Sequence, residues 1–582
     1  MDLAAQGHSR AEALWALVQR SIARRNNRTH FILLSPLEQL MPRTYLRRLF
    51  CFPFVGDDID VAVDALERAH KAILCLFPHL SGHVALDKNG GKQSGRLELT
   101  YDDRYVKDSK LLVKVYDASE FPYTYEELRG LGMPPSKLPN FLVSNVPHDL
   151  GLDKPWAATV FQANFIRGGL ILAVYAHNSV IDEFGLSIVI DHFRDFLDES
   201  VVLPDERIDQ DEFRAVLDKG LAVDESLKSH REYNFPIVTT VKTPPDLSEA
   251  GSPVEEGSAK QASDILAAMA RGKVFAFSNE RIVTLRKFLE DNMKGAFFEL
   301  GELFLLKSVL ITEVLYALVW VFVTRARSRR FLNADGSPVQ GKNVRTSSIT
   351  LPVTIRGKMD PPVPEDFIGG TTVQSQAVLP LSRLLHKDSD SVLDLKFAGT
   401  DFKPKSATAL LSSLIEIRHA MAKVDEGHVR SLISACNVTP DIRDVTLNSH
   451  YKGGMDIVVE NWRALKYEDY TWEIPGIGND KRVEFVRPPW THQEGVMIFL
   501  PSRNPQPPRT TPLPQGAVII DEDDSEVLIQ LRTDDMDRLM QDHEFMWQCD
   551  CDSTHLVDRL SLRYDERGSK VDNQDTGYLI GD

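Results

Sequence analysis

The chain has 582 residues, of which 43% are hydrophobic and 26% charged, a composition typical of a globular protein too large for one hydrophobic core. Its net charge of −17 argues against a nucleic acid or an anionic membrane as a partner held by general electrostatic attraction. An anionic ligand would therefore need a local basic pocket, and we expect two lobes.

The cysteines indicate a reducing location. There are five of them, an odd number that is thinly spread, and the chain opens MDLAAQGHSRAEALWALVQRS without an apolar segment of the kind that directs secretion. We therefore expect a cytoplasmic protein. The cysteines are Cys51, Cys75, Cys436, Cys549 and Cys551.

Two elements in the first half are read from their apolar patterns. Residues 61–77 place small and large apolar side chains on one stripe, which predicts an amphipathic helix. Residues 170–176, LILAVYA, form a short apolar run after two glycines, which favours a buried strand. The polar stretch 177–185, HNSVIDEFG, therefore begins where a strand ends.

A change of composition divides the chain near its middle. From residue 239 the text reads TTVKTPPDLSEAGSPVEEGSAKQ, which is rich in Pro, Ser, Gly and Glu and typical of a solvated linker. We predict an N-terminal lobe at 1–238, a linker at 239–272 and a C-terminal lobe at 273–582. Helical and strand patterns alternate in both halves, which predicts two α/β lobes.

The second half contains an apolar run with two possible interpretations. Residues 303–323, followed by TRARSRR, have the length and the basic flank of a membrane span. However, Lys307 and Glu313 fall inside the run, so we favour a buried core helix over a membrane anchor. Beyond it we expect strands at 495–500 and 526–531 and a closing helix at 533–546, whose first turn is acidic.

Common motifs for metals, nucleotides and nucleophiles are missing. Cys549 and Cys551, with His543 and His555 near them, lack the spacing of zinc ligands, and the acidic residues 521–524 lack the pattern of a calcium loop. The sequence contains no GxSxG elbow, phosphate-binding loop or dinucleotide fingerprint. We therefore expect no bound metal.

His177 is the remaining candidate for chemistry. A histidine at the mouth of a buried strand can be desolvated and oriented enough to act as a general base near neutral pH. A buried histidine whose ring is satisfied by backbone groups explains the same pattern equally well. The residue alone does not decide between a catalytic and a structural role.

The chain resembles the BAHD acyltransferases, which use coenzyme A (CoA) thioesters, in the fungal branch typified by trichothecene 3-O-acetyltransferase. The stretch 161–185, FQANFIRGGLILAVYAHNSVIDEFG, is similar to the family's HHxxxDG region and the strand before it. The segments 34–54, 78–82, 310–323, 351–370 and 467–478 resemble other family segments in the same order.

This resemblance implies a fold of two similar chloramphenicol-acetyltransferase-like α/β lobes, with mixed sheets, helices and a tunnel between the lobes. Acyl-CoA, acetyl-CoA for example, would enter from one face and a hydrophobic, hydroxylated metabolite from the other. Family members are usually monomers. The resemblance implies that Asp182 holds the motif loop, that Asp469 and Trp472 belong to the DFGWG segment, and that Arg356 is the partner of Asp469.

The motif departs from the family at its catalytic position. The residue four places before Asp182 is Asn178, and His177 precedes it. An amide cannot act as a general base at neutral pH, although it can orient a substrate by hydrogen bonds. His177 is basic, but neighbouring side chains on a strand point to opposite faces, so only a bulge or turn would redirect it.

Three functions remain open. The protein is an acyltransferase in which His177 or another group replaces the motif histidine, or it catalyses a cyclisation or rearrangement of a bound metabolite, or it binds without catalysis. Acyl transfer to a terpenoid or polyketide hydroxyl is the leading hypothesis. Binding two substrates side by side is worth about 7 to 11 kcal/mol, more than the roughly 3 to 5 kcal/mol lost with a base, so some transfer would survive without the histidine.

Overall fold

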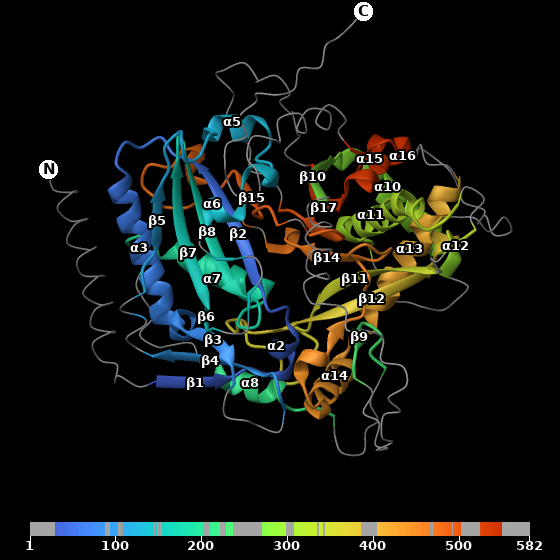
Figure 1. Cartoon of the computed structure of the whole chain (residues 1–582), viewed down its shortest axis with the longest axis horizontal. Coiled ribbons are helices and arrows are strands. Elements are labelled where there is room, and N and C mark those ends of the chain that lie inside the picture. Colours follow the sequence, from blue (N-terminus) through green and yellow to red (C-terminus); the bar gives the residue numbers. More distant parts are fainter. Residues whose placement is uncertain are drawn as a thin grey trace, which may run out of the picture.

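The computed structural model describes residues 29–549 apart from a set of gaps. The gaps are 88–92, 103–105, 107–108, 145, 148–149, 152–153, 202–209, 222–228, 237–269, 298–307, 334–336, 341–343, 386–403, 466, 468–469, 492 and 502–523. The described residues form two lobes side by side, each built on a twisted sheet with helices (Figure 1).

The N-terminal lobe contains a five-stranded sheet in the order β15-β2-β8-β7-β5. Apolar side chains cover both faces, so β8 is buried throughout and reads as a continuous apolar run. One face packs against α3 (Ile59–Leu76) and α7 (Glu183–Asp195). The strands are β15 (Phe485–Arg487), β2 (Tyr45–Pro53), β8 (Gly169–His177), β7 (Thr159–Ile166) and β5 (Leu112–Val115).

Smaller elements surround that sheet. A four-stranded sheet joins β1 (Thr29–Leu33), β4 (Leu97–Asp102), β3 (His83–Leu86) and β6 (Trp156–Ala157). The helices are α2 (Pro36–Leu40), α5 (Tyr125–Gly130), α6 (Asn140–Val143) and α8 (Asp211–Leu217). Strands β9 (Tyr233–Asn234) and β13 (Thr446–Leu447) pair across the two halves of the chain.

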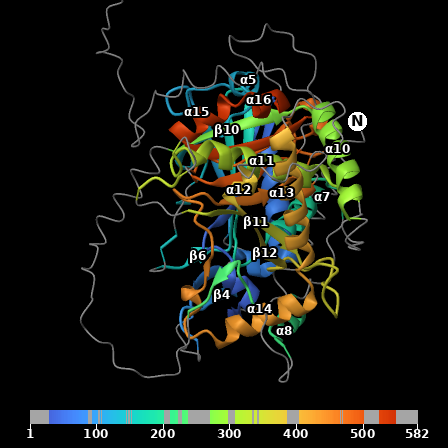
Figure 2. The ribbon, with the colours of Figure 1, turned by 90° about the vertical axis from the view of Figure 1, so that its right-hand side faces the viewer.

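The C-terminal lobe contains a six-stranded sheet in the order β10-β17-β16-β14-β11-β12. Helices α10, α11 and α13 cover the face turned away from the N-terminal lobe (Figure 2). The strands are β10 (Ala270–Phe277), β17 (Ser525–Arg532), β16 (Val496–Phe499), β14 (Ile457–Asn461), β11 (Thr346–Thr354) and β12 (Thr372–Pro380). The helices are α10 (Asn279–Phe297), α11 (Ile311–Ser328), α12 (Leu381–Leu384), α13 (Pro404–Ala422), α14 (Glu426–Val438), α15 (Thr533–Met540) and α16 (His543–Gln548).

One segment of the second half lies in the N-terminal lobe. Strand β15 pairs with β2, and Trp472 packs its ring 5.2 Å from each of the rings of Phe50 and Phe52. Ile474 is buried in the same apolar core. The two halves of the sequence are therefore not two independent spatial units, and the domain boundaries drawn at 239–272 stay a prediction.

Most elements read from the sequence appear, with shifted ends. The expected helix 61–77 is α3, the strand 170–176 is β8, and the described part of the buried helix expected in the run 303–323 is α11, which begins at Ile311. Residues 270–272, placed in the linker, are the start of strand β10, because they pair with β17 from Ala270 opposite Arg532 onward. The predicted closing helix is broken into α15 and α16, because Asp542 caps a new helix start.

The apolar run 303–323 lies partly outside the described residues. Its described part, in α11, is buried in the core of the C-terminal lobe, where Glu313 pairs with Arg418 at 3.0 Å. Within the described ranges, the structure contains no helix with the length and apolarity needed to cross a bilayer.

Candidate active site

A cavity of about 600 Å³ lies between the lobes. The N-terminal lobe lines it with residues 39–48, which lead into and along β2, and with Asn178. The C-terminal lobe contributes residues from the loop after α14 and from strands β14 and β16. Both lobes therefore have to be in place to form the site.

The charge of the cavity is opposite to that of the whole protein. Only one of the described lining residues, Glu460, is acidic, whereas five are basic. The basic residues are Arg43, Arg47, Arg48, Arg443 and Lys452. This is the local basic pocket that an anionic ligand requires in a chain with a net charge of −17.

Asn178 lines this cavity, whereas His177 does not. Side chains alternate along β8, so Leu172 and Val174 join the core on one face while Ile171 and Ala173 join the core on the other. The alternation continues past the end of the strand: Asn178 lines the large cavity, and His177 lines a small separate pocket. No bulge redirects the histidine.

His177 is held in a structural environment. Its side chain is buried, its ring meets Tyr45 edge-on at 5.6 Å, and its Nδ1 accepts a hydrogen bond of 3.2 Å from the backbone N–H of Ser179. Burial, together with the charge of Arg43, lowers the pKa of His177 to about 4. The imidazole is therefore neutral at pH 7 and a weak base.

Asp182 joins the two lobes. It caps α7 through a 2.8 Å hydrogen bond from the backbone N–H of Gly185 to Oδ1. Its Oδ2 accepts from the backbone N–H of Thr371 at 2.8 Å and from the hydroxyls of Thr371 and Thr372 at 2.7 and 3.0 Å. A Cβ on Gly185 would lie 2.0 Å from the carbonyl oxygen of Ile368, so only glycine permits this close approach.

The other motif residues have separate positions. Arg356 donates to the carbonyl oxygens of Pro364 and Phe367 and lies 4.3 Å over the ring of Phe184. Its expected partner, Asp469, lies outside the described residues, so that pairing stays a prediction. Trp472 is buried in the N-terminal core, away from the cavity lining.

Glu460 is a site residue that sequence reasoning missed. It lies on β14, is half-buried, and faces the same cavity as Asn178. Burial, reinforced by the negative charge of Glu183, raises the pKa of Glu460 to about 7 although Arg48 and Arg47 oppose the shift. The only signal in the sequence was a charged residue inside the apolar run DIVVENW.

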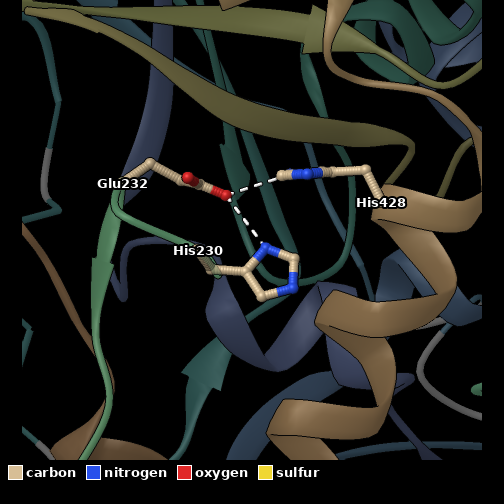
Figure 3. A group of neighbouring side chains, drawn as sticks. All are labelled: His230, Glu232 and His428. Carbon is tan, nitrogen blue, oxygen red and sulfur yellow. Dashed lines mark hydrogen bonds and ion pairs between the residues drawn. The ribbon is translucent and has the colours of Figure 1, made fainter. Parts of the chain in front are cut away.

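A second cluster lies beside one wall of the cavity. The Oε1 atom of Glu232 is 3.2 Å from Nδ1 of His230 and 3.0 Å from Nε2 of His428, as Figure 3 shows. The other ring nitrogen of His230 is 3.0 Å from the hydroxyl of Ser431. His230, Glu232 and His428 lie close enough together to ligate a metal ion. The same contacts hold the Glu232 carboxylate between two imidazoles, so they connect the 230–232 segment to α14.

The fold and the cavity define a class of protein: two α/β lobes with a basic cavity between them. Residues 44–195 match the model of the trichothecene 3-O-acetyltransferase-like N-terminal domain. The chain is also similar to a crystal structure of TRI101 from F. graminearum complexed with CoA and T-2 mycotoxin, with a TM-score of 0.61 and 17% identity over 89% of this chain and 99% of that one. That similarity shows the fold.

Similar sequences agree with this class. The eremophilane O-acetyltransferase ORF8 of Penicillium roqueforti is 23% identical, with 81% of this chain and 92% of the relative covered. The trichothecene 3-O-acetyltransferase TRI101 of Fusarium sporotrichioides is 24% identical, with 83% and 88% covered. Over most of its length the chain is therefore similar to fungal O-acetyltransferases, and residues 44–195 match the model of the domain named after them.

Proposed function

We propose that this protein is a CoA-dependent O-acyltransferase that moves an acyl group, acetyl in the first instance, onto a hydroxyl of a secondary metabolite. The observation that carries the proposal is the basic cavity between two lobes of this fold, with the motif position Asn178 on its wall. Arg48 pairs with Glu183 and Arg443 with Asp441, and the other basic lining residues, Arg43, Arg47 and Lys452, suit the phosphates of a CoA thioester. The relatives named as O-acetyltransferases support the same chemistry.

The acceptor is proposed to be a hydrophobic, hydroxylated molecule such as a terpenoid. Trp462, Val458 and Ile498 give one wall of the cavity an apolar surface. The solved structures with similar folds hold CoA together with T-2 mycotoxin or deoxynivalenol. A cavity of about 600 Å³ is within the range that encloses small ligands.

Within this proposal, Asn178 positions a substrate and Asp182 holds the loop that presents it. The amide of Asn178 can donate to the thioester carbonyl or accept from the acceptor hydroxyl. His177 has no direct part in the transfer, because it lies in another pocket and its pKa is lowered to about 4. A rearrangement of a bound metabolite is the competing function, favoured by the amide at the motif position.

The direct test incubates the purified protein with acetyl-CoA and a panel of hydroxylated terpenoids. Acyl transfer predicts release of free CoA thiol that depends on both the acceptor and the protein. Conversion of a terpenoid without consumption of thioester would favour rearrangement instead. No consumption and no conversion across the panel would contradict both catalytic functions.

We also propose that the protein acts as a cytoplasmic monomer. The four described cysteines are all free and buried, as expected in a reducing compartment. Both lobes that form the cavity come from one chain, so the site needs no second copy. Light scattering coupled to gel filtration tests the oligomeric state, and a mass of about twice 65.5 kDa would contradict it.

A further inference from the structure

The described lining of the cavity has no histidine at the motif position but includes one carboxylate. Asn178 occupies the position where the family motif has histidine, and no histidine belongs to the described cavity lining. Arginine and lysine side chains carry their protons at neutral pH, and burial raises the pKa of the lining residues Tyr45 and Tyr233. Glu460 is the one carboxylate among the described lining residues.

The position of Glu460 suits a role in the cavity. It lies on β14, which is held between β11 and β16 in the middle of the C-terminal sheet, and it pairs in register with Ile498. Asn178 faces the same space from the other lobe. A substrate bound between the lobes would therefore have the amide on one side and the carboxylate on the other.

Charged groups of the N-terminal lobe act on the carboxylate. Arg47 and Arg48 approach from β2, Glu183 approaches from the start of α7, and Trp462 lies two residues further along the chain. Arg48 forms an ion pair with Glu183, and its guanidinium lies 3.3 Å over the ring of Trp462. Because Arg48 is already engaged by Glu183, it does not fully neutralise Glu460.

We propose that Glu460 is the general base of this protein, taking the place of the motif histidine that Asn178 replaces. This inference rests on the proposed acyl transfer. The carboxylate of Glu460 takes the proton of the acceptor hydroxyl as the hydroxyl oxygen forms a bond to the thioester carbonyl carbon. The carbon–sulfur bond then breaks, and the leaving CoA sulfur takes the proton from the Glu460 carboxylic acid.

The acid–base properties of the site agree with that role. Burial and then the charge of Glu183 raise the pKa of Glu460 to about 7, against the opposing effect of Arg48 and Arg47. A carboxylate with this pKa is about half ionised at pH 7, and it is a stronger base than an ordinary glutamate. Because the base works deprotonated, the rate should rise with pH through about 7 and then level off.

The test compares four proteins in the CoA-release assay: the wild type, Glu460→Gln, Asn178→His, and the double variant Asn178→His/Glu460→Gln. The amide in Glu460→Gln keeps the shape and removes the base. We expect kcat to fall by about 100-fold or more, with the KM for acetyl-CoA changed by less than about threefold. The dependence of kcat on pH near 7 should disappear. Glu126→Gln, at an exposed glutamate of α5, is the matched control.

The double variant separates a lost base from a damaged site. A histidine at position 178 restores the motif, so Asn178→His/Glu460→Gln should recover most of the rate that Glu460→Gln loses. Glu460→Gln with a wild-type kcat and pH profile would overturn the role of Glu460 while leaving acyl transfer intact. A rise in KM alone, or a double variant as slow as Glu460→Gln, would also overturn it. Absence of transfer by the wild type would instead refute the proposed function.

Discussion

At the scale of single residues, the catalytic question depends on which way two neighbouring side chains point. The alternation of a strand was enough to predict that His177 faces away from the point that Asn178 addresses. The structure keeps that alternation past the end of β8. Glu460 could not be found in this way, because its strand carries no motif and it reaches the cavity only when the second lobe folds.

Replacing His177 by Ala should weaken the fold more than the reaction. The imidazole is buried against Tyr45, so its removal leaves a cavity, and we expect the free energy of unfolding to fall by about 2 to 3 kcal/mol. Because the ring lies outside the active cavity, the turnover rate should stay within about threefold of wild type. Urea unfolding and steady-state kinetics measure the two effects. A variant that is fully folded yet slower by about 100-fold would place His177 in the reaction.

At the scale of elements, the lobes are held together by buried polar contacts as well as by apolar packing. Asp182 fixes the start of α7 to the 371–372 loop, and Arg487 of β15 pairs with Glu526 of β17 at 2.8 Å, with both side chains almost fully buried. The cluster of His230, Glu232 and His428 ties the end of the N-terminal half to α14 (Figure 3).

Glu232 should make this last contact sensitive to acid. Burial alone would raise its pKa, but hydrogen bonds from His230 and His428 outweigh burial and lower it from 4.5 to about 2. A lowered carboxylate pKa stabilises the fold above pH 4.5, and this stability is lost as the pH falls toward 2. The shift corresponds to about 3 kcal/mol at pH 7.

The measurement is the free energy of unfolding of the wild type and of Glu232→Gln between pH 7 and pH 3. We expect the variant to be less stable at pH 7 by about 3 kcal/mol, with the gap closing as the pH falls. Glu280→Gln, at an exposed position of α10, is the control. A gap that stays constant with pH would show that the carboxylate charge is not what stabilises the contact.

At the scale of the whole molecule, the order of elements along the chain does not match their division in space. The sequence predicted two α/β lobes, and the solved relatives share that fold. It did not predict that β15 and Trp472, from the second half, complete the N-terminal lobe. A strand of three residues is too short to recognise by its pattern, and its partner β2 lies more than 400 residues earlier.

Residues 1–238 expressed alone should therefore not fold. They lack β15 and the buried Trp472, which leaves the edge of β2 unpaired and part of the core around Phe50 and Phe52 open. Circular dichroism and resistance to proteolysis, with the full chain as reference, show whether the fragment is folded. A fragment with a cooperative thermal transition would show that β15 and Trp472 are not required for folding.

In the proposed reaction, an acyl group passes from a CoA thioester to a hydroxyl in the cavity between the lobes. The most direct measurement is mass spectrometry of hydroxylated terpenoids incubated with the protein and acetyl-CoA that carries an isotope label in its acetyl group. We predict a product that carries the labelled acetyl group, formed only with the protein. A converted terpenoid without the label, or label released only as free acetate by hydrolysis, would contradict this reaction.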